Sequence, residues 1–284
     1  MTNLALGWQG LGRRRVVPGF RLSLGFTLFY LSVIVLIPLA VLVARAMGLG
    51  FSAIWAILST PRVLAALRVS FVTSLLAALC NLPIGLLVAW VLGRYEFAGR
   101  RLLDAMVDLP FALPTAVAGI SLSTLYAENG WIGSALAPFG IKVAYTPLGI
   151  FIALVFIGLP FVVRSVQPVL AEIDSELEEA SATLGASRWR TFRHVILPML
   201  LPAVLTGFAL ALARGIGEYG SVIFIAGNIP FVSEIAPLLI VTKLSEFDYA
   251  GAIVIAVAML TLSFLLLAAI NLLQFWTLRR LGHE

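Results

Sequence analysis

Long apolar runs separated by short polar segments make up most of the chain. A bilayer core takes about 20 apolar residues of helix, and six runs reach that length. We place them at 22–44, 69–92, 107–126, 147–166, 200–227 and 253–275. The first run is too long for a secretory signal and more spans follow it, so we expect an uncleaved anchor. The pattern predicts an all-α polytopic membrane protein with six transmembrane helices.

Composition agrees with a membrane location and argues against other classes. Hydrophobic residues make up 61% of the 284 residues and charged residues 12%, against roughly 25% charged in an ordinary soluble domain. The net charge of +5 comes from basic residues scattered between apolar runs, not gathered in the stripe that nucleic-acid binding uses. The single cysteine, Cys80, lies inside an apolar run, so we expect a packing role and neither a disulfide framework nor a metal cluster.

The distribution of basic residues orients the spans, because cytoplasmic loops carry the excess of Lys and Arg. With a cytoplasmic N-terminus, that side holds most of them: Arg13, Arg14, Arg15, Arg21, Arg94, Arg100, Arg101, Arg164, Arg188, Arg190, Arg193, Arg279 and Arg280. The outside holds Arg45, Arg62, Arg68, Lys142 and Lys243. We therefore expect both termini in the cytoplasm. A basic segment at 1–21 would precede a transmembrane domain at 22–278, and a tail would follow at 279–284.

The polar segment at about 168–198 predicts a helix, a turn and a second helix on the cytoplasmic side. Ser175 and Glu178 have the spacing of a capping box. Gly185 lies where a left-handed residue would end the first helix, and Ser187 is placed to cap the second. A solvated loop and a docking element for a partner are both open, although exposed apolar residues at helical spacing favour a partner.

The same segment resembles the EAA motif of ABC importer permeases, in which Glu-Ala-Ala is followed by a glycine and then by Ile-x-Leu-Pro. The matching residues are Glu179, Ala180, Ser181, Gly185, Val195, Leu197 and Pro198, where Ser181 replaces alanine and Val195 replaces isoleucine. The chain is also similar to the T-type permease family of bacterial sulfate/thiosulfate importers, in the stretches DLPFALPTAVAG (108–119), PFVVRSVQPVL (160–170), GEYGSVIFIAGNIP (217–230) and EFDYAGA (246–252).

This resemblance implies a type I ABC importer permease fold, also called MetI-like, in the bacterial inner membrane. It implies a complex with a homologous W-type permease, two ATP-binding cassette subunits and an extracytoplasmic sulfate-binding protein, and no cofactor held by this chain. Transport of sulfate or thiosulfate would proceed by alternating access, with the EAA helices in a cleft of the ATPase. Glu179 would face a basic residue there.

The sequence itself contains no G-x-x-x-x-G-K-[ST] phosphate loop, so ATP hydrolysis is expected from partner subunits. It also shows no nucleophile elbow and no spacing of metal ligands. Nothing in the residue chemistry separates sulfate from another oxyanion such as molybdate. The rival from another class is a self-sufficient secondary transporter, which should show internal repeats or a chain of protonatable groups across the membrane. We find neither.

The fifth run carries an arginine and a glutamate four residues apart, Arg214 and Glu218. Ionisable side chains at membrane depth are costly unless they face a cavity or each other. Gly215, Gly217 and Gly220 would let the helix break and expose backbone to a water-filled path. These residues are candidates for a translocation pathway or gate. A structural ion pair with close-packed glycines is the alternative.

The third run offers a second pathway candidate. Pro110 and Pro114 lie one turn apart and Thr115 follows. Each proline removes a backbone donor and distorts the helix, which frees carbonyl groups for a hydroxyl or a water. A pathway lining and a kinked packing helix are both compatible with this pattern.

Overall fold

The computed structural model describes residues 19–280 of the chain. The expected basic segment at 1–21 and the tail at 279–284 therefore fall mostly outside the described residues. Contacts divide the chain into two compact units, 1–48 and 49–284, which we describe separately. Within residues 19–280 all regular secondary structure is helical, as predicted.

The first unit is one long apolar helix. It consists of α1 (Phe20–Leu31), a π-helical turn η1 (Ser32–Leu36) and α2 (Ile37–Met47). The stretch Leu22–Met47 is long and apolar enough to cross a membrane. Its large side chains are exposed within the unit, for example Phe26 at 69%. Exposure of so much apolar surface to water is unfavourable, whereas contact with lipid is not. The exposed side chains therefore agree with the expected first transmembrane span.

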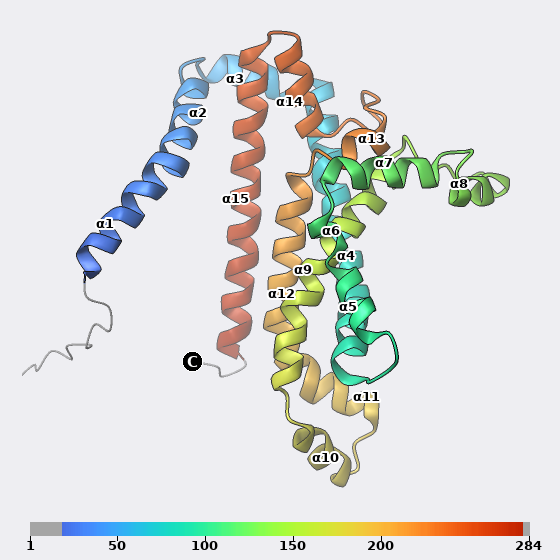
Figure 1. Cartoon of the computed structure of the whole chain (residues 1–284). Coiled ribbons are helices and arrows are strands. Elements are labelled where there is room, and N and C mark those ends of the chain that lie inside the picture. Colours follow the sequence, from blue (N-terminus) through green and yellow to red (C-terminus); the bar gives the residue numbers. More distant parts are fainter. Residues whose placement is uncertain (1–18, 281–284) are drawn as a thin grey trace, which may run out of the picture. The chain divides into compact units, whose positions relative to one another are not determined.

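The second unit is built around three long helices, α4 (Pro61–Arg94), α9 (Pro147–Glu172) and α12 (Leu197–Ile216), which pack together and form its core (Figure 1). A fourth, α15 (Tyr249–Arg280), packs on α12, on α14 (Ala236–Ser245) and on α3 (Phe51–Leu58). Shorter elements connect them: α8 (Trp131–Leu136), η2 (Ala137–Phe139) and α13 (Val222–Ala226).

Small residues let the core helices approach closely. Val162 of α9 lies between a glycine of α4 and a glycine of α12. A Cβ added at Gly85 would lie 2.7 Å from the Val162 Cβ, and one added at Gly207 would lie 2.7 Å from its Cα. Membrane helices associate largely through such van der Waals contact, because lipid offers no hydrophobic driving force between them.

Within the described residues five unbroken helical stretches are long and apolar enough to span a membrane, and the expected third span is not among them. The expected third span, 107–126, is divided into α6 (Leu109–Ala112) and α7 (Thr115–Tyr126), after α5 (Arg100–Val107). The break falls at Leu113, whose backbone is extended (φ −80°, ψ 135°). The cause is Pro114, because a proline disfavours helical geometry in the residue before it.

The expected fifth span also differs. Helix α12 ends at Ile216 and not near 227, and α13 is a separate short helix after a turn at 217–221. At its other end, α12 continues without interruption from α11 (Arg188–Thr191) through a π-helical turn η3 (Phe192–Ile196). The second helix of the polar segment is therefore the beginning of the fifth span and not a separate element.

The helix–turn–helix segment with α10 (Ser175–Thr183) and α11 lies at one end of the second unit, and α7, α8, α13 and α14 lie toward the other (Figure 1). A second buried cluster, which includes Ile150, Leu154 and Val222, packs α13 against α9, while α14 packs on α4. The candidate coupling residues therefore lie at the α10–α11 end, and the pathway candidates lie around the end of α12 and the break between α6 and α7.

Candidate functional site

The turn between α10 and α11 is formed as the sequence predicts. Gly185 has φ +78°, in the left-handed region. Its N–H donates to the Ala182 carbonyl (2.9 Å), and the N–H of Ala186 donates to the Ser181 carbonyl (3.1 Å). These are the two hydrogen bonds of a Schellman motif. Ser187 then caps α11, since its hydroxyl accepts from the Arg190 N–H at 3.4 Å.

The predicted capping box at the start of α10 is wrong. The N-cap residue is Asp174, and Ser175 is already the first helical residue. In a capping box the glutamate would turn back toward the N-cap N–H. Here Glu178 is turned to another element, because its Oε1 lies 2.9 Å from Nη2 of Arg94 at the end of α4. The box also fails on register, because with Asp174 as the N-cap the N3 position belongs to Leu177 and not to Glu178.

The EAA-type residues differ in exposure: those at the start of the motif face outward, and those at its end are half-buried. Glu179 and Ala180 are exposed, beside the exposed apolar residues Leu184 (89%) and Trp189 (67%). The oxygen atoms of Ser181 and Thr191 lie 2.8 Å apart and join α10 to α11. The serine that departs from the Glu-Ala-Ala pattern therefore makes an internal contact that alanine could not. Val195, Leu197 and Pro198 are half-buried where η3 enters α12.

At the end of α12, Arg214 and Glu218 form an ion pair, the arrangement that the sequence analysis kept as the alternative. Glu218 is 1% exposed and also accepts hydrogen bonds from the Ser221 N–H (3.0 Å) and hydroxyl (2.9 Å). Arg214 remains 36% exposed. The carboxylate is thus enclosed and fully partnered, while the guanidinium keeps a free surface. This asymmetry leaves part of the Arg214 side chain accessible.

The glycines around this pair allow the chain to turn and to approach its neighbours. Helix α12 ends at Ile216, and Gly217 is its C-cap. A Cβ on Gly220 would overlap the Thr115 hydroxyl, and a Cβ on Gly215 would lie 3.3 Å from the Ser74 hydroxyl. The structure therefore brings Thr115, at the start of α7 just after Pro114, against the break in α12. Two pathway candidates that are far apart in the sequence are neighbours.

Pro110 lies one turn before Pro114, in the short helix α6. Sequence analysis missed the arginine that holds this region. Arg164 of α9 donates to both carboxylate oxygens of Asp108 (2.8 and 2.6 Å) and to Oδ1 of Asp104 (2.6 Å). The hydrogen bond from Arg164 also lowers the pKa of Asp104 below its ordinary 3.8. The broken span is thereby attached to α9.

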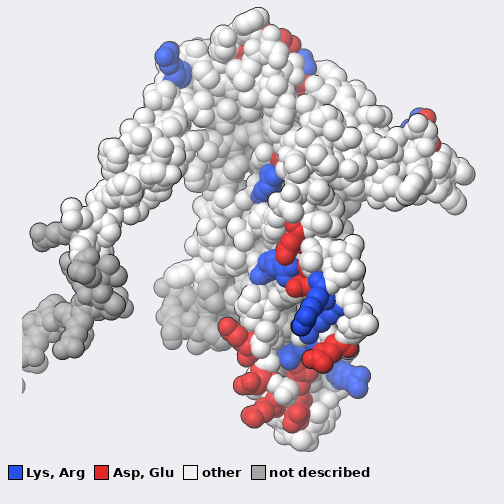
Figure 2. Space-filling view, in the orientation of Figure 1, with Lys and Arg blue, Asp and Glu red and all other residues white. Residues whose placement is uncertain are grey.

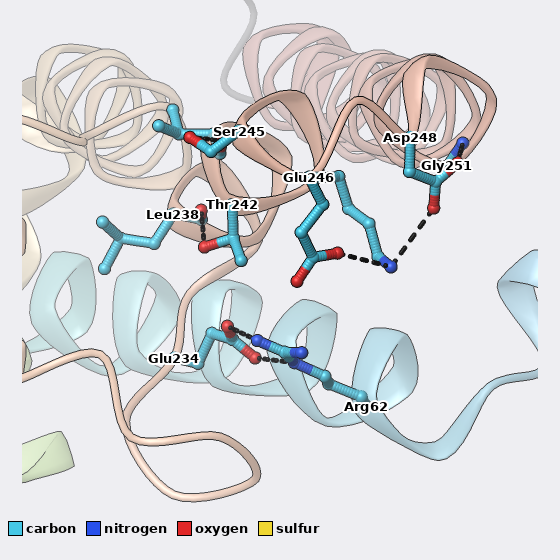
Figure 3. Close-up of polar contacts among 10 residues, drawn as sticks. Arg62, Glu234, Leu238, Thr242, Ser245, Glu246, Asp248 and Gly251 are labelled. Atoms are coloured by element: carbon cyan, nitrogen blue, oxygen red, sulfur yellow. Dashed lines mark hydrogen bonds and ion pairs between the residues drawn. The ribbon is translucent and has the colours of Figure 1, made fainter.

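A second ion pair that the sequence does not indicate involves the first turn of α4. Arg62 binds Glu234 through two hydrogen bonds, Nε to Oε2 at 2.8 Å and Nη2 to Oε1 at 2.7 Å (Figure 3). Glu234 is 1% exposed and precedes α14. Nearby, Asp248 accepts from the Gly251 N–H at the start of α15, which lowers the pKa of Asp248. No sequence spacing indicates the Arg62–Glu234 contact, because 172 residues separate the partners.

Charged side chains on the visible face of the second unit concentrate around the α10–α11 end, and a few continue to mid-length (Figure 2). Within residues 19–280 no group of His, Cys, Asp and Glu could hold a metal ion. Several long apolar helices, with charged side chains gathered at one end, indicate a polytopic membrane protein.

Comparisons with known proteins agree with this class. Residues 81–281 match the family described as binding-protein-dependent transport system inner membrane component. The sulfate transport system permease protein CysT of Escherichia coli strain K12 is 51% identical over 271 residues, which cover 95% of this chain and 98% of that protein. The protein of the same name from Synechocystis is 51% identical over 250 residues, covering 88% and 87%. The chain therefore belongs to the inner-membrane components of binding-protein-dependent transport systems.

Solved structures share the fold at low sequence identity. A bacterial ABC transporter involved in the import of the acidic polysaccharide alginate matches with a TM-score of 0.74 at 14% identity, covering 90% of this chain and 94% of that one. The MetNI methionine ABC transporter matches with a TM-score of 0.51 at 20% identity, covering 77% and 93%. The expected type I ABC importer permease fold is confirmed.

Proposed function

We propose that the chain is the T-type, channel-forming subunit of an ATP-driven importer of sulfate and thiosulfate. The observation that carries this proposal is the identity of 51% along nearly the whole length of relatives named as sulfate transport permeases. The proposed complex contains a W-type permease, two ATP-binding cassette subunits and an extracytoplasmic binding protein. The distribution of basic residues favours cytoplasmic termini, with the α10–α11 segment on the same side.

Energy would enter through the α10–α11 segment. Its exposed residues Glu179, Leu184 and Trp189 combine one negative charge with apolar surface, which suits insertion into a cleft on the ATPase. Large exposed apolar side chains on a polar, water-facing element indicate a protein partner. Closure of the ATPases on ATP would displace this segment and turn the permease pair outward.

The anion would then pass the break at the end of α12. Arg214 keeps an exposed guanidinium there, while Glu218 is enclosed by its own partners. Gly215, Gly217 and Gly220 shape the turn, and Pro110, Pro114 and Thr115 belong to the broken helix packed against it. A pathway needs contacts weak enough to release the dianion. One partly neutralised arginine meets that need better than a closed basic pocket would.

Reconstitution in vesicles tests the proposal. The complete complex should accumulate radiolabelled sulfate on addition of ATP and binding protein, and the chain alone should neither hydrolyse ATP nor accumulate sulfate. ATP-dependent uptake by the single polypeptide would exclude a subunit role. Stronger competition by molybdate than by thiosulfate would reassign the substrate to another oxyanion. Glu179→Lys should insert normally yet lose the ATPase on purification, and reversal of the contacting ATPase charge should restore part of it.

A further inference from the structure

The last turn of α4 contacts both halves of the α10–α11 segment. Arg94, the final residue of α4, lies 2.9 Å from Glu178 Oε1 and donates to the Ile173 carbonyl at 3.2 Å. One turn earlier, the Trp90 ring meets the Phe192 ring edge to face, with centroids 5.6 Å apart. Phe192 in turn stacks on Trp189 of α11. We propose that Arg94 is a positioning residue that couples the α10 helix to α4.

Helix α10 depends on such contacts because it has no core of its own. None of its residues is buried. Among the described residues, its polar side-chain contacts to other elements are the Arg94–Glu178 ion pair at its fourth residue and the Ser181–Thr191 contact at its seventh. A helix held at two points transmits displacement through those points. The Ser181–Thr191 contact leads to α11 and α12, and the Arg94 contact leads to α4.

Arg94 also controls the joint between α9 and α10. Ile173 follows the last residue of α9, and its carbonyl is among those at a helix C-terminus that lack a partner within the helix. Arg94 supplies a donor to it. The close approach that permits this is set one residue earlier, because a Cβ on Gly93 would lie 2.9 Å from Leu170 Cδ2. The guanidinium is 23% exposed and also lies over the Trp90 ring at 5.8 Å.

The role of α4 follows from its length and its two ends. At 1.5 Å per residue its 34 residues extend about 50 Å, well beyond a bilayer core of about 30 Å. Arg94 ties one end to α10, and Arg62 ties the other to the buried Glu234 before α14. Between them, Ser74 lies beside Gly215 at the break in α12. A displacement of α10 thus reaches the region of the break through α4 as well as through α12.

This inference rests on the proposed function, and the test uses the complete reconstituted complex. Arg94→Ala should leave the amount of bound ATPase unchanged but lower the sulfate transported per ATP hydrolysed by roughly fivefold or more, within the range of common coupling energies. Backbone amides of 174–183 should exchange with deuterium faster, whereas those of α12 should not. The matched control is Arg101→Ala, which removes an exposed arginine at the second residue of α5.

The charge swap Arg94→Glu with Glu178→Arg separates a positioning role from general damage. It should recover much of the transport per ATP, because the ion pair is restored with its direction reversed. Equal loss in Arg101→Ala, unchanged amide exchange in Arg94→Ala, or no recovery in the swap would overturn the proposal. Failure of the wild-type complex to take up sulfate would refute the proposed function instead, and the amide-exchange comparison would still decide whether Arg94 holds α10.

Discussion

Replacement of Arg214 tests whether the charge at the α12 break serves the anion or only its neighbour. In Arg214→Gln the Glu218 carboxylate loses its cation but keeps the Ser221 N–H and hydroxyl as donors. Breaking a fully buried ion pair costs about 3–5 kcal/mol. Arg214 is 36% exposed, and one hydrogen bond to a charged group contributes about 1.5–3 kcal/mol. We therefore expect a destabilisation of about 1–3 kcal/mol.

Such a loss should leave most of the complex assembled in the membrane. Sulfate flux should nevertheless fall sharply, because the field that favours a dianion at the break is gone, while basal ATP hydrolysis continues. The assay is sulfate uptake per assembled complex, with complex abundance and thermal stability measured on the same preparation. The double variant Arg214→Gln with Glu218→Gln removes the stranded carboxylate and should recover stability without recovering flux.

The opposite pattern would refute the pathway role. If Arg214→Gln removes the complex from the membrane, and the double variant restores both abundance and full uptake, Arg214 is only a structural partner of Glu218. Arg214→Lys is a useful further comparison. It keeps the charge but loses the planar donor set, so it should retain more flux than the glutamine variant.

Three further changes test other parts of the structure. Gly185→Val should misalign α10 and α11 and reduce co-purification of the ATPase, because a side chain at φ +78° is disfavoured by roughly 1 kcal/mol and a β-branched one by more. Gly220→Ala should lower transport by overlap with the Thr115 hydroxyl, and adding Thr115→Ala should restore part of it in the same uptake assay. Asp104→Asn should flatten the acid limb of thermal stability. Because Arg164 lowers the pKa of Asp104, its carboxylate stabilises the wild type above its ordinary pKa of 3.8, and this stabilisation is lost as the pH falls through the lowered value. Equal acid sensitivity in the two proteins would contradict this assignment.

Local signals in the sequence predict the helices and the polar turn well. The lengths of the apolar runs located the five long helices, although the helix ends in the structure differ from the predicted ones. The left-handed conformation of Gly185 follows from its place after an apolar pattern with helical spacing. The prolines at 110 and 114 indicated distortion, but apolar length alone could not show that the third run would divide. The extended backbone at Leu113 is a geometric result of the proline that follows it.

Contacts between distant segments could not be predicted in this way. Arg164 and Asp104 are 60 residues apart, and five α-helices lie between Arg94 and Glu178 in the sequence. No spacing rule pairs such residues, because their meeting depends on how α4 and α9 pack. The capping box that Ser175 and Glu178 suggested fails for a local reason, because the N-cap is Asp174, one residue earlier.

The unbroken helix from Arg188 to Ile216 also constrains how the lengths of related chains can vary. Successive helical residues are rotated by about 100° about the axis, so one inserted residue within α12 would turn Arg214 away from its present face relative to α10. Insertions in the loops around 95–99 or 127–130 carry no such penalty. The π-helical turn at Phe192–Ile196 holds an extra residue per turn. It is the one place along α11, η3 and α12 where a change in length could be absorbed without shifting the angular register, and length differences among homologues should cluster there.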